Sequence, residues 1–222
     1  MTMGFIEKLR LKRDRERGFV LHKFTRSDGS FDYERYKAIQ TDGNHRKLDR
    51  VFVSEDNIRF LSEVISTRMP EAHFGLCHGT RRGLEQNWFA KYLECEVIGT
   101  EISDTASQFP NTIQWDFHDV KPEWVGAVDF IYSNSFDHSY DPEACLTAWM
   151  SCLRPGGLCF LEHTTEHGPA NTSELDPFGA EITLLPYLIL KWGKGRFSVV
   201  DLLAGPALSQ ERPVHYLVVR NT

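Results

Sequence analysis

The fold of this chain of 222 residues is decided by the stretch His73-Phe74-Gly75-Leu76-Cys77-His78-Gly79-Thr80-Arg81-Arg82-Gly83. Its first five residues form a short apolar run of the kind that a buried strand requires. A turn with two glycines follows, and from about Gly83 to Leu93 large apolar side chains recur at helical spacing. Strand, glycine turn and helix in this order are typical of the first unit of a parallel α/β sheet.

The alternation of strands and helices continues on both sides of this stretch. Ser54 is a good N-cap for a helix that we expect to end at Met69-Pro70. Further strands are predicted over residues 96–100, 112–115, 128–132 and 158–162, with a helix over 142–153 that Pro155-Gly156-Gly157 stops. Near-continuous apolar strands between amphipathic helices predict a parallel sheet that is covered on both faces.

The C-terminal third follows a different pattern. A helix is predicted from about Ala180 to Lys191, and two strands over residues 197–203 and 215–220. The connection between these strands is about the minimum for a parallel crossover, and it contains two prolines and a glycine that break any helix. We therefore predict an antiparallel hairpin that closes one edge of the sheet.

The N-terminal segment is basic, whereas the rest of the chain is acidic. Residues 1–50 carry 13 Lys and Arg against 8 Asp and Glu, and residues 51–222 carry 12 against 23. We predict a short charged helix over residues 5–17, followed by an irregular segment over 18–53 with turns at Asp28-Gly29 and Asp42-Gly43-Asn44. An acidic body disfavours nucleic-acid binding, which depends on neutralising phosphates.

The composition is that of one globular domain. Apolar residues make up 41% and charged residues 25%, and no apolar run is long enough to cross a bilayer. The N-terminus is charged almost at once, which is unlike a signal peptide. The five cysteines are scattered and odd in number, a pattern that favours reduced thiols and a cytoplasmic location.

Polar motifs follow the predicted strands at the points where ligands bind in α/β sheets. Glu101 closes the second strand, 22 residues after Gly79, and Asp116 follows the third. The fourth strand runs through Asp129-Phe130-Ile131-Tyr132-Ser133-Asn134-Ser135, and His138 comes shortly after it. The turn Leu153-Arg154-Pro155-Gly156-Gly157-Leu158 introduces the fifth strand. Together these motifs resemble the class I S-adenosylmethionine-dependent methyltransferases, in which a Pro-Gly-Gly turn of this form has the same place.

The resemblance implies a Rossmann-like, doubly wound α/β fold with a seven-stranded, mostly parallel sheet and an antiparallel C-terminal hairpin. It implies an N-terminal basic helix and lid-like extension over residues 1–53 and a catalytic domain over 54–222. The lid prediction rests on the polar and aromatic side chains of residues 33–53; a packed extension or a dimer contact is the alternative.

The resemblance also assigns S-adenosylmethionine as cofactor. Glu101 corresponds to the acid that accepts hydrogen bonds from two ribose hydroxyls, and Asp116 to the acid that receives the adenine amino group. The predicted cofactor-binding residues are His78, Gly79, Thr80, Arg81, Gly83, Glu101, Ile102, Asp116, Phe117, Asn134 and Ser135. Cys77 and Arg81 depart from the family loop, which has an acid and a glycine at these places. Arg81 either binds the cofactor carboxylate or folds outward.

Methyl transfer needs little acid–base machinery, because the sulfonium is already activated. The protein must align the acceptor, exclude water and take a proton from a hydroxyl or amine. We predict Asp137, His138 and His163 as catalytic residues, since they follow strands 4 and 5 and histidine changes charge near neutral pH. We assign no metal ligands. The sequence His-Thr-Thr-Glu-His over residues 163–167 fits a zinc peptidase pattern, but it follows a strand rather than lying on a helix.

Two other functions compete with methyl transfer. A catalytically inactive, methyltransferase-like binding module would explain Cys77 and Arg81, while an NAD-dependent oxidoreductase or epimerase would also need a glycine loop and an acid after strand 2. The terminal hairpin and the absent second glycine of the dinucleotide motif disfavour the oxidoreductase. No Asn-Pro-Pro-Tyr-type sequence follows strand 4, which disfavours methylation of a base or a glutamine amide. For a methyltransferase, we expect transfer to oxygen of a small-molecule, sugar or lipid-precursor acceptor, because histidines lie at the edge of the predicted pocket.

Overall fold

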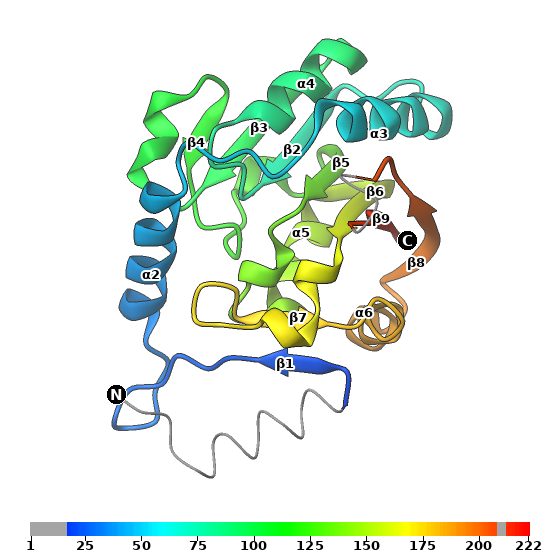
Figure 1. The fold of residues 1–222 in the computed structure, drawn as a ribbon. Coiled ribbons are helices and arrows are strands. Elements are labelled where there is room, and N and C mark those ends of the chain that lie inside the picture. The colour runs from blue at the N-terminus through cyan, green and yellow to red at the C-terminus, as the bar shows by residue number, and fades with distance from the viewer. Residues whose placement is uncertain (1–16, 208–211) are drawn as a thin grey trace.

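A computed structural model describes residues 17–207 and 212–222 (Figure 1). The predicted charged helix over residues 5–17 lies almost wholly outside these ranges. In the described parts of the chain, no helix is both long and apolar enough to span a bilayer.

One seven-stranded sheet organises the molecule, with strand order β4-β3-β2-β5-β6-β9-β8. The strands are β2 (Phe74–His78), β3 (Glu96–Glu101), β4 (Thr112–Gln114), β5 (Val128–Ser133), β6 (Leu153–His163), β8 (Phe197–Ala204) and β9 (His215–Asn221). The first five are parallel, and β9 runs antiparallel to both β6 and β8. The predicted α/β class, parallel sheet and terminal hairpin are confirmed.

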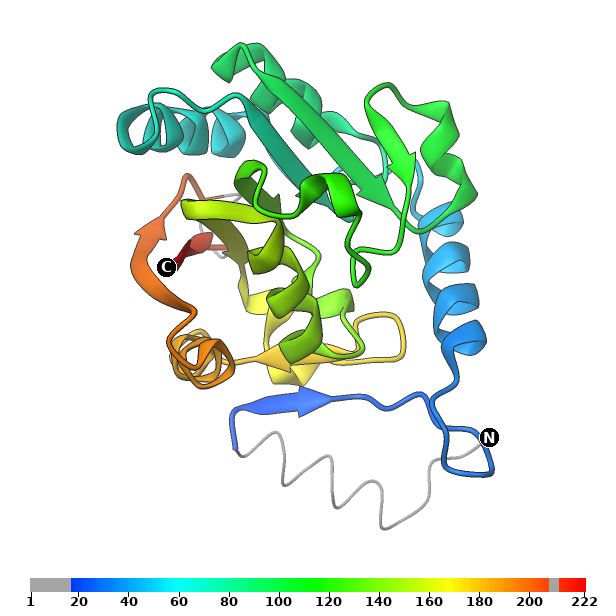
Figure 2. The same cartoon turned by 180° about the vertical axis from the view of Figure 1, so that it is seen from behind.

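Helices cover both faces of this sheet (Figures 1 and 2). On one face α3 (Glu55–Arg68) and α4 (Leu84–Leu93) pack against alternate strand residues such as Phe130 and Phe160. On the other, α5 (Pro142–Cys152) and α6 (Leu185–Gly193) pack against their neighbours Ile131 and Cys159. The period-2 alternation of a strand divides the apolar residues between two cores, which is why the strands read as continuous apolar runs.

The direction of the strand order reverses between β2 and β5. From β2 the chain moves outward through β3 to β4, and it then returns to add β5 and β6 on the other side. In open α/β sheets, ligands bind outside the carboxyl ends of the strands at such a switch point. Short 3-10 helices lie in the loops there: η1 (Asp104–Gln108), η2 (Pro122–Trp124), η3 (Phe136–His138), η4 (Thr165–His167) and η5 (Pro169–Asn171).

The prediction for residues 18–53 was partly wrong. The turn at Asp28-Gly29 is present, but Asp42-Gly43-Asn44 lies inside the helix α2 (Tyr33–Arg46). Gly43 is a packing residue, since a Cβ on it would lie 2.3 Å from Leu175 Cδ1. Asn44 is buried, and its Oδ1 accepts a hydrogen bond from the Thr105 hydroxyl at 2.8 Å. Tertiary contacts thus make the sequence Asp42-Gly43-Asn44 helical, although its composition is typical of a turn.

Two further boundaries differ from the predictions. Ala180 does not begin a helix; it ends β7 (Phe178–Ala180), which pairs antiparallel with β1 (Phe19–Leu21), and α6 begins only at Leu185. The strand β6 begins at Leu153 rather than 158, because Leu153 already pairs with Val128 before a register shift. The Pro-Gly-Gly turn therefore lies within β6 as an irregularity at the sheet end.

We predict that Gly75→Ala destabilises the protein, because a Cβ at this position of β2 would lie 2.2 Å from Phe130 Cζ in a fully buried core. Overpacking of this kind costs roughly 1–3 kcal/mol. Urea unfolding measures the loss, and the double variant Gly75→Ala/Phe130→Leu should recover much of it. Equal stability of Gly75→Ala and wild type would contradict the close packing of these two strands.

Candidate active site

The loop after β2 meets the end of β5 at the switch point. Gly79 has a φ of 75°, and its N–H donates to the Thr100 carbonyl at 2.9 Å. A Cβ on Gly79 would lie 2.6 Å from Ser135 Cβ, so this position admits only glycine. The Ser135 hydroxyl in turn donates to the Gly79 carbonyl at 3.1 Å. The loop is therefore held against both neighbouring strands with its backbone close to the cavity.

Glu101 lies at the end of β3 with only 6% of its surface exposed. The backbone N–H groups of Arg81 and Ser103 donate to its two carboxylate oxygens at 3.1 and 3.0 Å. Burial raises the pKa of Glu101, and these two hydrogen bonds partly oppose that effect. Because each carboxylate oxygen can accept a second hydrogen bond, Glu101 is able to receive two hydroxyls from a ligand.

Arg81 occupies the place where the family loop has a glycine. Its φ is 43°, a left-handed backbone that glycine adopts more readily. Its guanidinium lies 4.9 Å from the centre of the Phe52 ring, and Nη1 donates to the Arg50 carbonyl at 3.5 Å. The side chain lies along the cavity wall, where it lines both cavities. Cys77, in place of the family acid, is fully buried in the core.

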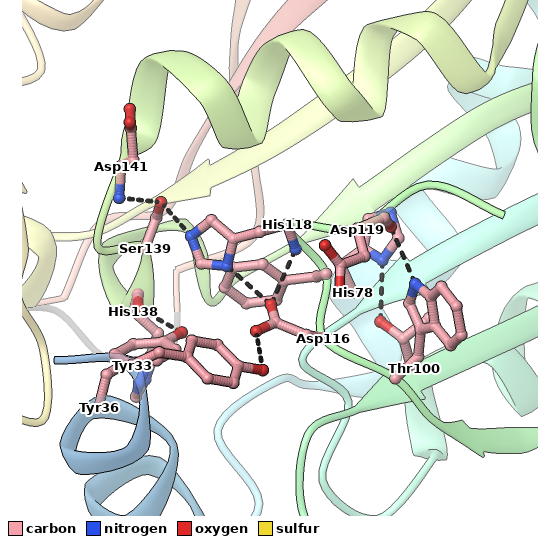
Figure 3. A network of polar contacts seen from close by, with 12 residues as sticks. Tyr33, Tyr36, His78, Thr100, Asp116, His118, Asp119, His138, Ser139 and Asp141 are labelled. Carbon is pink, nitrogen blue, oxygen red and sulfur yellow. Dashed lines mark hydrogen bonds and ion pairs between the residues drawn. The ribbon is translucent and has the colours of Figure 1, made fainter. Parts of the chain in front are cut away.

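Asp116 is the centre of a buried polar network (Figure 3). The backbone N–H of His118 donates to Asp116 Oδ1 at 2.9 Å, and His118 Nδ1 lies 2.8 Å from the same oxygen. Tyr33 of α2 donates its hydroxyl to Oδ2 at 2.8 Å. Burial acts to raise the pKa of Asp116, but the hydrogen bonds and charge of His118 outweigh it and leave the pKa below its usual value.

Nothing in the sequence analysis pointed to His118. Its ring stacks on Tyr140 with a centroid distance of 3.7 Å, and its Nε2 lies 2.9 Å from the Ser139 hydroxyl (Figure 3). The spacing of an acid and a histidine two residues apart, directly after a strand, is the signal that could have indicated the pair. His118 binds one Asp116 oxygen, and Tyr33 binds the other.

The structure gives His78 a different place from the predicted one. Its ring is 2% exposed and stacks on Trp149 at 4.7 Å, with Nδ1 2.8 Å from the Thr100 hydroxyl. Burial lowers its pKa to about 3, so the ring is neutral. The side chain therefore packs in the core and does not line either cavity.

Two adjoining cavities lie over the strand ends. The larger, of about 330 Å³, is lined by Gly79, Thr80, Arg81, Asn134, Ser135, Asp137 and His138, together with other charged side chains. The smaller, of about 50 Å³, lies between α2 and the residues Gly79, Arg81, Glu101, Ile102, Asp116, Phe117 and Ser135. Except for His78 and Gly83, every predicted cofactor-binding residue therefore lines at least one cavity. Gly83 instead caps α4, where a Cβ would lie 2.4 Å from Gln86 Nε2.

Asp137 and His138 lie together in η3, on the wall of the larger cavity. The Asp137 Oδ1 atom is buried and has no hydrogen-bond partner. Burial raises the pKa of Asp137 to about 6. His138 Nδ1 lies 2.8 Å from Gln40 Oε1, and its Nε2 lies 3.5 Å from Asp176 Oδ1. The sequence did not predict that Asp176 would join these two residues.

His163 does not line either cavity, although the sequence analysis placed it among the catalytic residues. Its Nε2 lies 2.8 Å from the Ala180 carbonyl of β7, and burial lowers its pKa to about 4. His167 Nδ1 accepts a hydrogen bond from the Thr164 N–H at 3.0 Å, which caps η4. His163 and His167, the two histidines of the pattern that fits a zinc peptidase, therefore each bind a different part of the backbone.

Two buried glutamates of the larger cavity were missed. Glu162 of β6 accepts hydrogen bonds from the hydroxyls of Tyr132 and Tyr216 at 2.7 and 3.2 Å, and burial raises its pKa to about 7. Glu85, in the first turn of α4, is 8% exposed, and burial raises its pKa to about 8. From the sequence alone, an acid on a helix or a strand is expected at the surface. Only the folded structure shows that these two are buried.

Comparison with known proteins gives a family match over part of the chain. Residues 76–161 match the model of the family described as a methyltransferase domain, and this range includes the glycine loop, Glu101, Asp116 and His138. No curated protein sequence matches the chain.

Solved structures share the fold at low identity. The 1,6-didemethyltoxoflavin N1-methyltransferase of Burkholderia thailandensis superposes with a TM-score of 0.66 at 14% identity, over 87% of this chain and 92% of that one. The plantazolicin methyltransferase BpumL has a TM-score of 0.61 at 12% identity, over 85% of this chain and 96% of that one. Both structures contain S-adenosylhomocysteine. The [4+2]-cyclase SpnF superposes with a TM-score of 0.54 at 13% identity, over 73% of this chain and 80% of that one.

The fold and the family match agree. Residues 76–161 match the methyltransferase domain model, and the complete sheet shares its fold with the solved methyltransferase structures. The presence of a cyclase on the same fold means that the reaction has to be argued from the site itself.

We predict that Glu85→Gln makes stability less dependent on pH. The folded chain keeps the Glu85 proton up to a pH of about 8, whereas an unfolded glutamate loses it near 4.3. Between these values the free energy of unfolding of the wild type therefore falls as pH rises. At pH 8.5 the variant should be more stable by roughly 1–3 kcal/mol.

Denaturant titrations at pH 5 and 8.5 measure this difference. The exposed Glu63→Gln is the control and should leave the profile unchanged. Parallel profiles for wild type and Glu85→Gln would show that Glu85 is ionised in the folded protein.

Proposed function

We propose that this protein is an S-adenosylmethionine-dependent methyltransferase acting on a small-molecule, sugar or lipid-precursor acceptor, with oxygen as the methylated atom. One observation carries the proposal. Gly79, Glu101 and Asp116 lie at the ends of three neighbouring strands, beside a cavity of about 330 Å³ that contains Asp137 and His138. The bound S-adenosylhomocysteine of the two methyltransferases with the same fold supports the choice of cofactor.

The residues present fit this cofactor. Glu101 has accepting capacity for the ribose hydroxyls, and Asp116, with Ile102 and Phe117 nearby, is available to the adenine. The Thr80 hydroxyl lines the larger cavity, is buried and has no hydrogen-bond partner. An unpaired buried hydroxyl is costly, and a polar ligand beside the loop would satisfy it. Arg81 and Asn134 provide charge and hydrogen bonds for the amino-acid end.

When bound, the cofactor supplies a methyl group that is already activated by the sulfonium charge. The chain has to align the acceptor oxygen with that methyl group and to manage the hydroxyl proton. Asp137 and His138 are the catalytic residues of this proposal, because both line the larger cavity next to Gly79 and Ser135. His163 has no part in it, since its ring faces β7.

The larger cavity supports a polar acceptor of modest size. Its volume is at the lower end of the range for small-molecule sites, about 300–1,000 Å³. Its wall contains both acids and bases, among them Lys47, Arg50 and Glu162. Charged and hydrogen-bonding groups of this density suit a hydroxyl-rich molecule such as a sugar better than an apolar one.

The segment before residue 54 acts as a lid in this proposal, over a catalytic domain of residues 54–222. Helix α2 lies beside the strand ends (Figures 1 and 2). Its residues Tyr36, Gln40 and Asn44, together with its C-cap Lys47, close the smaller cavity. That cavity, of about 50 Å³, is far smaller than the usual range for ligand sites. A nucleoside between Glu101 and Asp116 therefore requires α2 to move outward.

Titration calorimetry with S-adenosylhomocysteine tests the cofactor assignment. Wild type should bind, and Glu101→Ala should bind at least about 10-fold more weakly, because hydrogen bonds to a charged acceptor are each worth roughly 1.5–3 kcal/mol. Glu96→Ala, at the exposed other end of β3, is the control. Absence of binding by the wild type would favour the inactive binding module.

Tyr33→Phe tests the lid. The substitution removes the hydrogen bond that holds α2 to Asp116, and it frees Oδ2 for the adenine. We expect roughly 3- to 10-fold faster association of S-adenosylhomocysteine by stopped-flow tryptophan fluorescence, since such a bond contributes about 1 kcal/mol. Tyr187→Phe, on the exposed surface of α6, is the control. Slower association in Tyr33→Phe would mean that Tyr33 helps to receive the cofactor.

A further inference from the structure

Three side chains with metal-ligating atoms converge on one wall of the larger cavity. Asp137 and His138 come from η3, and Asp176 from the loop before β7. One ligand atom of each lies within 4.8 Å of the other two. Among the described residues, this is the one group of His, Cys, Asp and Glu side chains with the spacing of a metal site.

The tautomer of His138 follows from its partner on α2. The amide nitrogen of Gln40 donates to the Leu175 carbonyl at 2.9 Å, which turns the amide oxygen toward His138. That oxygen lies 2.8 Å from His138 Nδ1 and can only accept, so Nδ1 carries a hydrogen. In the neutral ring, Nε2 then presents its lone pair to the opposite side.

The atoms that face this lone pair are also electron-rich. Nε2 lies 3.5 Å from Asp176 Oδ1, while the other oxygen of Asp176 accepts a hydrogen bond from the Ser173 hydroxyl at 3.1 Å. Asp137 Oδ1 is buried without a hydrogen-bond partner. Lys47 influences Asp137 through its charge but donates no hydrogen bond to that buried oxygen. A buried acceptor without a donor is costly, and a cation held by these three side chains would remove that cost for Asp137 Oδ1.

We propose that Asp137, His138 and Asp176 bind a divalent cation of the Mg²⁺ and Mn²⁺ class. Two carboxylate oxygens and one imidazole nitrogen form a donor set of this kind. Ligands that are each about 2.1 Å from a cation lie roughly 3–4 Å apart, and the observed 3.5 Å falls in this range. The Gln40 amide oxygen accepts the hydrogen bond from His138 Nδ1. Metal-binding histidines are usually oriented by such a hydrogen bond from the ring nitrogen that does not bind the metal.

The role of this cation rests on the proposed function, whereas its binding does not. Three protein ligands leave coordination positions open toward the cavity that we assign to the acceptor. A divalent cation lowers the pKa of a hydroxyl that reaches it and orients the oxygen. This would assign the acceptor class more narrowly, to molecules with a hydroxyl able to enter a cation's coordination sphere.

Electron paramagnetic resonance of Mn²⁺ with the full chain tests the site, because the signal of free Mn²⁺ falls on binding. Wild type should bind one Mn²⁺, and an excess of Mg²⁺ should displace it. Asp137→Asn and Asp176→Asn keep the side-chain shapes and should each weaken binding at least 10-fold. Glu166→Gln is the matched control, since Glu166 is a carboxylate of the same cavity outside the proposed ligand set.

The binding of S-adenosylhomocysteine separates this proposal from the preceding one. Asp176→Asn should bind S-adenosylhomocysteine like the wild type while it loses Mn²⁺, because Asp176 does not line the cavity beside Glu101. Failure of the wild type to bind Mn²⁺ at millimolar concentration would overturn the site. An equal loss in Glu166→Gln would overturn it too, since general attraction to an acidic cavity would then explain the binding.

Discussion

Gly79 and Ser135 are in such close contact that no side chain fits between them, and this contact determines the form of the site. It joins the loop after β2 to the end of β5, the two strands between which the sheet order reverses. The hydrogen bond from Gly79 to the Thr100 carbonyl adds the third strand, β3. Once these three ends are fixed, Glu101 on one side and Asp137 and His138 on the other can lie only along one crevice. The proposed division into a cofactor side with Glu101 and an acceptor side with Asp137 and His138 follows from that crevice.

The buried acids along the crevice differ in how they are compensated. Glu101 receives two backbone N–H groups, and Asp116 receives His118 and Tyr33. The only hydrogen bond that opposes burial at Glu85 and at Asp137 comes from the residue's own backbone, and burial raises the pKa of Glu85 to about 8 and that of Asp137 to about 6. The compensated acids are those expected to face neutral hydroxyl and amino groups of a ligand. Glu85 and Asp137 both line the larger cavity, so a cationic or hydrogen-bond-donating group bound there would compensate them.

The sequence predicted those parts of the structure that local patterns determine. The alternation of strands and helices predicted the sheet, and Glu101 and Asp116 were predicted as cofactor ligands because the first ends a predicted strand and the second follows one. Helix α2 could not be predicted, because Gly43 and Asn44 are helical only through contacts with Leu175 and Thr105, more than fifty residues away. His78 and His163 were misplaced for a related reason: a polar residue at a strand end can turn toward the core as easily as toward the crevice. Asp176 was not considered, since no pattern links its loop to η3.

Helix α2 connects the two sides of the site. Through Tyr33 it reaches Asp116 on the cofactor side, and through Tyr36 and Gln40 it holds the backbone and the ring of His138 on the acceptor side. An outward movement of α2 large enough to admit a nucleoside would break these bonds together, because they lie along one rigid helix. The imidazole of His138 would then be free to turn until the helix returned. Assembly of the acceptor side would thus depend on closure over the cofactor, and a methyl donor would be in place before the groups that handle the acceptor are oriented.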